Sequence, residues 1–108
     1  MIKTTIRIIG SATDLVSNLT VETVLYEYEA AEYDASGLDD LILTALDNAM
    51  HAAGVSTLEL LAPLQPQVSF LLFVDEEPIR AVLQLSSVTV KKMASAGASF
   101  DFDPYIYA

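Results

Sequence analysis

The chain has 108 residues, 53% of them apolar and 19% charged, a composition that predicts one folded domain over residues 1–108 rather than a disordered segment. Fifteen acidic residues against five basic ones give a formal net charge of −10 at pH 7. A field of that sign repels phosphate backbones and anionic lipid headgroups, which disfavours direct binding to nucleic acid or to a membrane. The absence of cysteine excludes disulfides, thiolate metal sites and cysteine nucleophiles.

Targeting signals are not evident in the sequence. The apolar runs are far shorter than the roughly 20 residues that span a bilayer. The N-terminal residues also lack the layout of a signal peptide. We therefore expect a cytoplasmic protein.

The first third of the chain predicts two strands with a short helix between them. Apolar and polar residues alternate over 2–9, as in a half-buried strand, and Gly10 ends the run. The stretch "SATD" has the form of a capping box and predicts a short helix over about 12–18. Residues 20–30 alternate again and predict a second strand.

The clearest helix is predicted over about 37–53. Ser36 followed by Asp39 repeats the capping-box pattern before it, and Gly54 stands where a C-terminal cap belongs. One stripe of apolar residues recurs at helical spacing and predicts a buried face: Leu38, Leu41, Ile42, Ala45, Leu46, Ala49 and Ala53.

The second half predicts three strands, a short helix and a final strand. A third strand over 55–62 would end at Pro63 and Pro66, and 67–74, apolar on both faces, would lie in the middle of the sheet. Residues 79–86 would return from it as a hairpin. Ser87 would cap a short helix ending at Gly97, and the last strand contains Pro104, which favours an edge position or a bulge.

These elements predict an α+β fold. We expect a single, mostly antiparallel β-sheet with the helix of about 37–53, and one or two short helices, packed on one face.

Two pairs of side chains are candidate metal ligands. Asp101 and Asp103 share one face of the last strand and could hold a divalent cation for phosphoryl transfer, but no acid follows them. Their alternative role is a solvated edge whose charges discourage strand pairing. Asp47 and His51 are one helical turn apart, yet the chain has no second histidine, which favours a surface pair.

The four glycines are isolated at the boundaries of elements, so no phosphate-binding loop is evident and no cofactor is predicted.

Acidic and tyrosine residues are the candidates for a partner-binding surface. The run Asp75, Glu76 and Glu77 would lie at a hairpin turn, where it is either simply hydrated or directed at a basic groove. Tyrosines suit interfaces because they bury area and keep a polar tip, although sheet packing explains many of them. The predicted partner-binding residues are Asp75, Glu76, Glu77, Asp101, Asp103, Tyr105 and Tyr107.

The C-terminal half resembles a known family. The strand "VSFLLFV", the acidic turn "DEEP", the segment "LQLSSVTVKKMASAGAS" and the closing "FDFDPYIYA" together look like the bacterial domain-of-unknown-function family 4279 (DUF4279). The likeness covers about residues 24–108. The resemblance implies a small α+β protein without an established activity, with immunity-type proteins among its roles.

Three functions follow as hypotheses. The favoured one is a non-catalytic acidic binding protein, an immunity-type or anti-defence inhibitor that covers a basic surface on a toxin or nuclease. The second is a self-associating structural domain, such as a homodimer. The third is a metal-dependent phosphoryl-transfer enzyme that uses Asp101 and Asp103.

Overall fold

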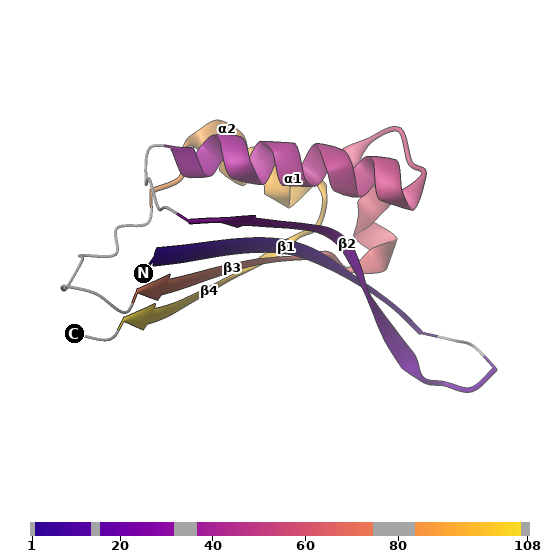
Figure 1. Cartoon of the computed structure of the whole chain (residues 1–108). Coiled ribbons are helices and arrows are strands. Elements are labelled where there is room, and N and C mark those ends of the chain that lie inside the picture. The colour runs from indigo at the N-terminus through magenta and orange to yellow at the C-terminus, as the bar shows by residue number, and fades with distance from the viewer. Residues whose placement is uncertain (1, 14–15, 32–36, 75–83, 107–108) are drawn as a thin grey trace.

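A computed structural model describes residues 2–13, 16–31, 37–74 and 84–106. It confirms the α+β fold: a four-stranded mixed sheet carries all the helices on one of its faces (Figure 1). The elements in chain order are β1 (Ile2–Thr13), β2 (Thr20–Ala30), α1 (Leu38–Ala53), the 3-10 helix η2 (Leu58–Leu64), β3 (Gln67–Val74), α2 (Ser87–Ser95) and β4 (Ser99–Ile106).

The sheet has the strand order β2-β1-β3-β4. β1 is antiparallel to both β2 and β3, while β4 is parallel to β3 and is reached through α2. The register between β1 and β2 shifts after Ile8, because Ile8 lies opposite Tyr26 and Ile9 opposite Val24. Leu25 is therefore the extra residue of a β-bulge.

The core lies between the sheet and the helices. Ile6 and Ile8 on β1 and Val68, Phe70 and Leu72 on β3 are fully buried, as period-two alternation requires for the face toward the helices. The neighbouring residues of β3 are half-buried on the opposite face. The prediction that 67–74 forms a central strand is thus correct.

Helix α1 supplies the other side of the core. Leu38, Ile42, Ala45, Leu46 and Ala49 are buried, which confirms the predicted stripe. The helix ends where Gly54 adopts φ +70°, a left-handed conformation that glycine accepts without strain, and the Gly54 N–H donates to the His51 carbonyl at 3.1 Å.

The C-terminal unit closes the sheet. Phe102 of β4 stacks on Phe70 of β3 with 5.5 Å between ring centroids. The N-cap of α2 is Ser86, whose side chain accepts the Thr89 N–H at 3.3 Å, so the predicted cap, Ser87, is wrong by one residue. Asp39 Oδ1 of α1 accepts the Ser86 N–H at 2.9 Å and ties the two helices together.

Two predicted elements are wrong. The described residues of the predicted helix 12–18 are not helical: β1 continues to Thr13, which pairs with Thr20 in a hairpin with β2, and residues 16–17 form a turn. Residues 55–62 are not a strand, because Leu58, Leu61 and Leu64 recur every third residue and place one side of a 3-10 helix toward the core.

Two further predictions fall partly or wholly on residues that are not described. Most of the predicted return strand, 79–86, lies outside the described residues, and both edges of β3 are occupied by β1 and β4. Ser36 also lies outside the described residues. At the start of α1 the N-cap is Gly37, without a side-chain cap.

Substitution of Leu46 tests the packing of α1. Leu46 is 1% exposed. We expect Leu46→Ala to lower the free energy of unfolding by about 2–5 kcal/mol. Leu46→Asp should prevent folding, because it removes the apolar contacts of Leu46 and buries a carboxyl group that must take up a proton or stay unpaired, a combined cost comparable with the about 5–15 kcal/mol that holds a domain together. Chemical denaturation followed by circular dichroism measures both. Asp47→Ala, one residue along on the exposed face, should unfold like the wild type.

Asp39 makes stability depend on pH at the acidic end. Hydrogen bonds from the Thr89 side chain and the Ser86 backbone hold its pKa below the ordinary 3.8. A lowered pKa contributes stability that is present above pH 3.8 and is lost as pH falls through the lower value of the folded state.

We therefore expect Asp39→Asn to be less stable than the wild type at neutral pH, with the difference shrinking on acidification below pH 3.8. Urea titrations at a series of pH values measure it. Asp40→Asn removes the neighbouring first-turn carboxylate and is the control. A difference that stays constant with pH would contradict this role of Asp39.

Candidate functional site

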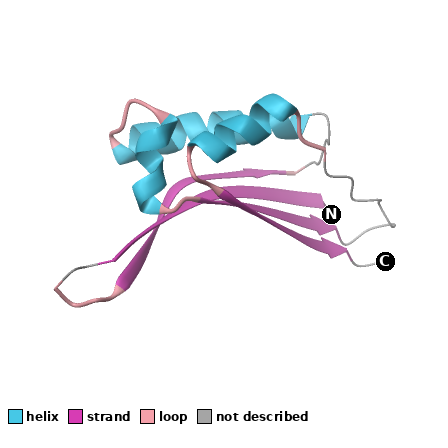
Figure 2. Ribbon diagram, turned by 180° about the vertical axis from the view of Figure 1, so that it is seen from behind, coloured by secondary structure: helices cyan, strands magenta, loops and turns pink. Residues whose placement is uncertain are grey.

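The two faces of the sheet differ. The helices pack on one face, and no described element covers the other, as the views from the front and from behind agree (Figures 1 and 2). Since alternate residues point to opposite faces, the register identifies the residues of this second surface. The open face includes Lys3, Thr5, Arg7, Glu27, Glu29, Ser69, Leu71, Phe73, Asp101 and Asp103.

Charged pairs occupy the β1–β2 side of the open face. Lys3 Nζ lies 3.3 Å from Glu29 Oε1, and Arg7 Nη2 lies 3.5 Å from Glu27 Oε1. All four side chains are between 42% and 49% exposed, so each pair contributes at most about 1 kcal/mol to stability. Their larger effect is on the charge of the surface, because each cation lies beside an acid of β2 that balances it.

An apolar strip runs along the middle of the open face. Thr5 is 3% exposed although none of the described helices covers it, and it lies opposite Leu71 in the register between β1 and β3. Leu71 and Phe73 are half-buried on the same face. The strip is flanked by charged residues on both sides.

Asp101 and Asp103 form the other border of the open face. They lie opposite Ser69 and Leu71 in the register and are both exposed, which confirms that they share one face. β4 is an edge strand, as Pro104 predicted. β4 is also two strands from β1, roughly 10 Å, so its carboxylates form a border separate from the Lys3 and Arg7 pairs.

Of the other candidate residues, one falls at an open-face position and the rest lie in another layer or are not described. Tyr105 lies opposite Phe73 in the register. Asp75, Glu76, Glu77 and Tyr107 lie outside the described residues. Asp47 and His51 are exposed on α1, in the other layer of the molecule.

The described residues do not form a set of ligands for a metal ion. Within the described ranges, no three His, Asp or Glu side chains come close enough together to hold a metal ion. Asp101 and Asp103 are thus without a third acidic or histidine ligand among the residues that the structure describes.

A projecting arm is the feature that sequence reasoning missed. β1 pairs with β3 only as far as Ile9, whereas it pairs with β2 as far as Thr13. Residues 10–13 and 16–23 therefore form a two-stranded ribbon, the arm, which extends beyond the rest of the sheet (Figure 1). It helps to give the molecule a longest dimension of 50 Å against a shortest of 17 Å.

The turn of the arm carries the signal that could have revealed it. Asn18 has φ +57°, a left-handed conformation that asparagine tolerates better than most residues. Thr13 and Thr20, which are β-branched, flank the turn and pair with each other.

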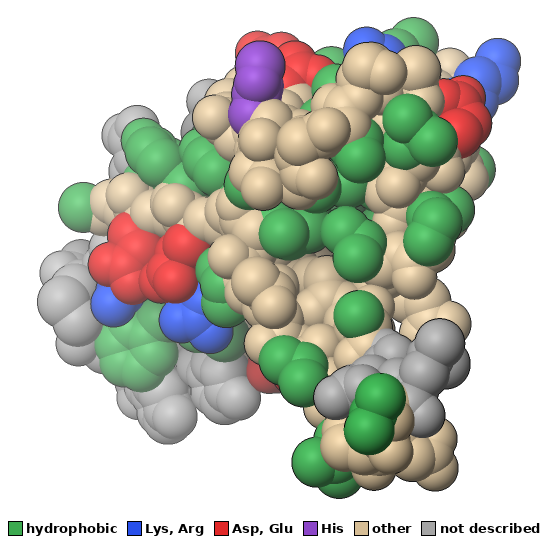
Figure 3. All heavy atoms as spheres, turned by 90° about the vertical axis from the view of Figure 1, so that its right-hand side faces the viewer, with side chains coloured by type: hydrophobic (Ala, Val, Ile, Leu, Met, Phe, Trp, Pro, Cys, Tyr) green, Lys and Arg blue, Asp and Glu red, His purple; other side chains and the backbone are tan. Residues whose placement is uncertain are grey.

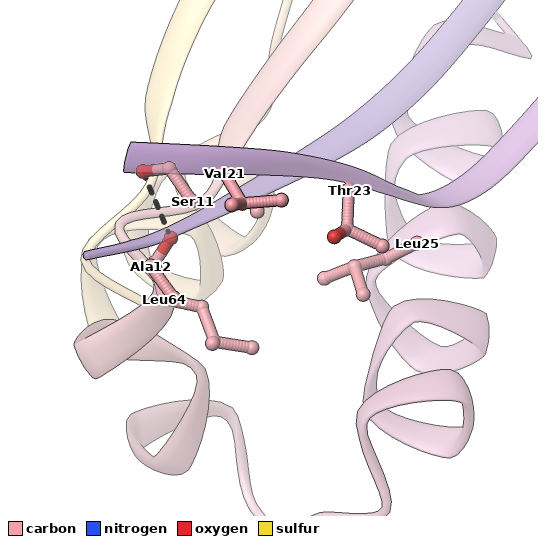
Figure 4. A pocket seen from close by; sticks show the side chains of 7 residues that line it. Ser11, Ala12, Val21, Thr23, Leu25 and Leu64 are labelled. Carbon is pink, nitrogen blue, oxygen red and sulfur yellow. Dashed lines mark hydrogen bonds between the residues drawn. The ribbon is translucent and has the colours of Figure 1, made fainter. Parts of the chain in front are cut away.

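A hollow lies at the base of the arm, between β2 and η2. Its volume is about 220 Å³, and in Figure 4 Leu64 of η2 faces Thr23 and Leu25 of β2 across an open space. The Ser11 hydroxyl donates to the Leu64 carbonyl at 3.5 Å. The residues that line the hollow are all uncharged: Gly10, Ser11, Ala12, Val21, Thr23, Leu25 and Leu64.

A second, shallower groove lies between α1 and β2. Tyr26, Tyr28, Asp40, Leu41 and Thr44 line it. Tyr26 packs against the core, and Tyr28 is 45% exposed. Sheet packing therefore accounts for Tyr26, as anticipated for part of the tyrosines.

Comparison with known proteins gives no relative whose binding surface could be compared with these. No protein-family model, curated protein or solved structure matches the chain. The resemblance to DUF4279 therefore stays a prediction. In the described part of the chain, no helix has the length and apolar character needed to cross a membrane.

The phosphoryl-transfer hypothesis makes a direct prediction about Asp101 and Asp103. Because two carboxylates alone hold Mg²⁺ poorly, we expect titration calorimetry with Mg²⁺ or Mn²⁺ to give the same heats for the wild type and for Asp101→Asn/Asp103→Asn. Saturable binding that the double substitution abolishes would contradict this and would favour the enzyme hypothesis.

Proposed function

We propose that this protein is a non-catalytic, cytoplasmic binding domain that presents its open face to a basic surface on a protein partner, in the manner of an immunity-type or anti-defence inhibitor. The single observation that carries the proposal is a sheet whose helices lie on one side only, with acidic residues on both borders of the other side.

The charge of the open face supports a basic partner. Four carboxylates and two cations have been named on it, and both cations lie beside acids of β2. Asp101 and Asp103 extend this surplus to the opposite border. In the field of a chain with net charge −10, a positively charged surface is attracted before contact, which raises the association rate at low ionic strength.

The apolar strip supports a macromolecular partner rather than a small ion. Leu71, Phe73 and the buried Thr5 lie between the two acidic borders. Protein interfaces commonly combine a less polar centre with a polar rim. The partner that fits has an aliphatic or aromatic centre with arginine or lysine around it.

The acidic residues at the borders also bear on strand pairing at the edges of the sheet. Asp101 and Asp103 lie on the edge strand β4, and Glu27 and Glu29 lie on the edge strand β2. Charged residues on edge strands discourage pairing with other strands. The partner therefore contacts the face of the sheet instead of adding a strand to it.

A salt-dependent pull-down with charge-matched variants tests the proposal. The immobilised wild-type chain should retain a basic protein from lysate at low salt and lose it at high salt, because screening weakens charge attraction. Asp101→Asn/Asp103→Asn should reduce the association rate of that protein by roughly tenfold at low salt.

The control is Asp40→Asn/Asp47→Asn, which removes the same number of charges from the exposed side of α1. It should retain the partner almost as well as the wild type does. Retention that ignores salt, or equal losses in the two variants, would show that the open face is not the binding surface.

A further inference from the structure

The arm exposes aliphatic side chains far from the core. Val16 is 96% exposed, Leu19 65% and Val21 58%. Figure 3, which views the molecule from the side on which the arm projects, shows hydrophobic side chains gathered on its lower part and no basic side chain among them. A two-stranded ribbon is only marginally stable by itself in water. Its exposed aliphatics therefore mark a contact surface.

The turn of the arm does not line the hollow of its own chain. Leu19 lies two residues before Val21, the first residue of β2 that lines the hollow, and four residues before Thr23, which is roughly 13 Å along the strand. The hollow of about 220 Å³ is larger than the roughly 150 Å³ that accommodates a benzene ring, so aliphatic side chains fit it. One chain thus carries two exposed aliphatic residues at the turn, Val16 and Leu19, and an uncharged recess that these two residues do not line.

We propose that the arm is a dimerisation element: Val16 and Leu19 of one copy fill the hollow of a second copy, which returns its own arm in the same way. The exchange is reciprocal, so one two-fold axis satisfies both arms and the assembly closes at two copies. The hollow of each copy is then bounded by its own Leu25 and Leu64 and filled by the partner's arm.

The charge distribution allows a second copy to approach at the hollow. Two chains of net charge −10 repel each other over most of their surfaces, so they approach most easily through an uncharged region. The hollow is such a region. Glu22, between Val21 and Thr23, points to the opposite side of the arm by strand alternation. A basic partner would find no counter-charge in the hollow.

The sign of the salt dependence separates this surface from the open face. Salt screens the repulsion between two acidic copies, so dimerisation strengthens as salt is added. Binding of a basic partner to the open face weakens under the same change. The two proposals therefore stand or fall independently.

Sedimentation velocity over a range of concentrations and salt tests the dimer. The wild type should change from 11.7 kDa to twice that mass as concentration rises, and at lower concentration in high salt. Val16→Lys/Leu19→Lys should raise the dissociation constant at least about thirtyfold. These lysines reduce the net negative charge, so general repulsion cannot explain the loss.

The matched control is Val88→Lys/Val90→Lys, which changes two half-exposed valines on α2 by the same charge. It should dimerise like the wild type or more tightly. Thermal unfolding by circular dichroism verifies that both variants fold. A wild-type chain that stays monomeric throughout, an arm variant that still dimerises, or an equal loss in the control would each overturn the proposal.

Cross-linking locates the contact directly, because the natural chain has no cysteine. Under mild oxidation, Leu19→Cys mixed with Ala12→Cys should give a disulfide-linked dimer, since Ala12 is exposed and lines the hollow. Leu19→Cys mixed with Val88→Cys should not link above the level of random collision. Equal yields in the two mixtures would contradict contact between the tip and the hollow.

Discussion

The pairing of β1 with strands on both sides is the constraint on which the rest of the molecule depends. β1 hydrogen-bonds β2 along one edge and β3 along the other, and its side chains alternate between two environments. Ile6 and Ile8 enter the core, whereas Lys3 and Arg7 join the open face. A slip of one residue would bury the two cations beneath α1 and expose the isoleucines, so burial of the core also sets the pattern of the open face.

The bulge at Leu25 separates the two proposed contact surfaces, the open face and the hollow. In the part of β2 that follows the arm, Tyr26 and Tyr28 face the helices and lie opposite Ile8 and Ile6. Unbroken alternation would place Glu22 on that same side, inside the hollow. The extra residue reverses the alternation, so Val21 and Thr23 line the hollow instead. One irregularity in the ladder therefore keeps charge out of the recess while Glu27 and Glu29 stay on the open face.

Local periodicity was sufficient for much of this fold. The alternation of 20–30 and the apolar stripe of α1 are both repeated over three or more turns or pleats, and both elements have the expected type. Residues 58–62 of η2 were assigned to a strand, because leucines at every third position are hard to distinguish from alternation in so short a run. Strand order and the parallel pairing of β4 depend on contacts between distant segments, which no local pattern contains.

The candidate surfaces were predictable to the extent that they depend on alternation alone. Asp101 and Asp103 could be assigned to one face of an edge strand because their spacing and Pro104 are local features. The arm could not be recognised in this way. Its identity depends on where β3 stops pairing with β1, and that point is set by Gln67 opposite Ile9, almost sixty residues apart. The hollow likewise requires Leu64 of η2 to come against Gly10.

Net charge acts in opposite directions on the two surfaces. At −10, the chain would attract the basic surface proposed to bind the open face, and it repels another copy of itself. Under the two proposals, low ionic strength therefore favours binding to the partner, and high ionic strength favours self-association through the uncharged recess. The open face and the hollow lie on opposite sides of the sheet, since the hollow faces η2 and the open face is the one without helices. Two copies joined through their arms would thus leave both open faces uncovered, so that a dimer presents two acidic surfaces where a monomer presents one.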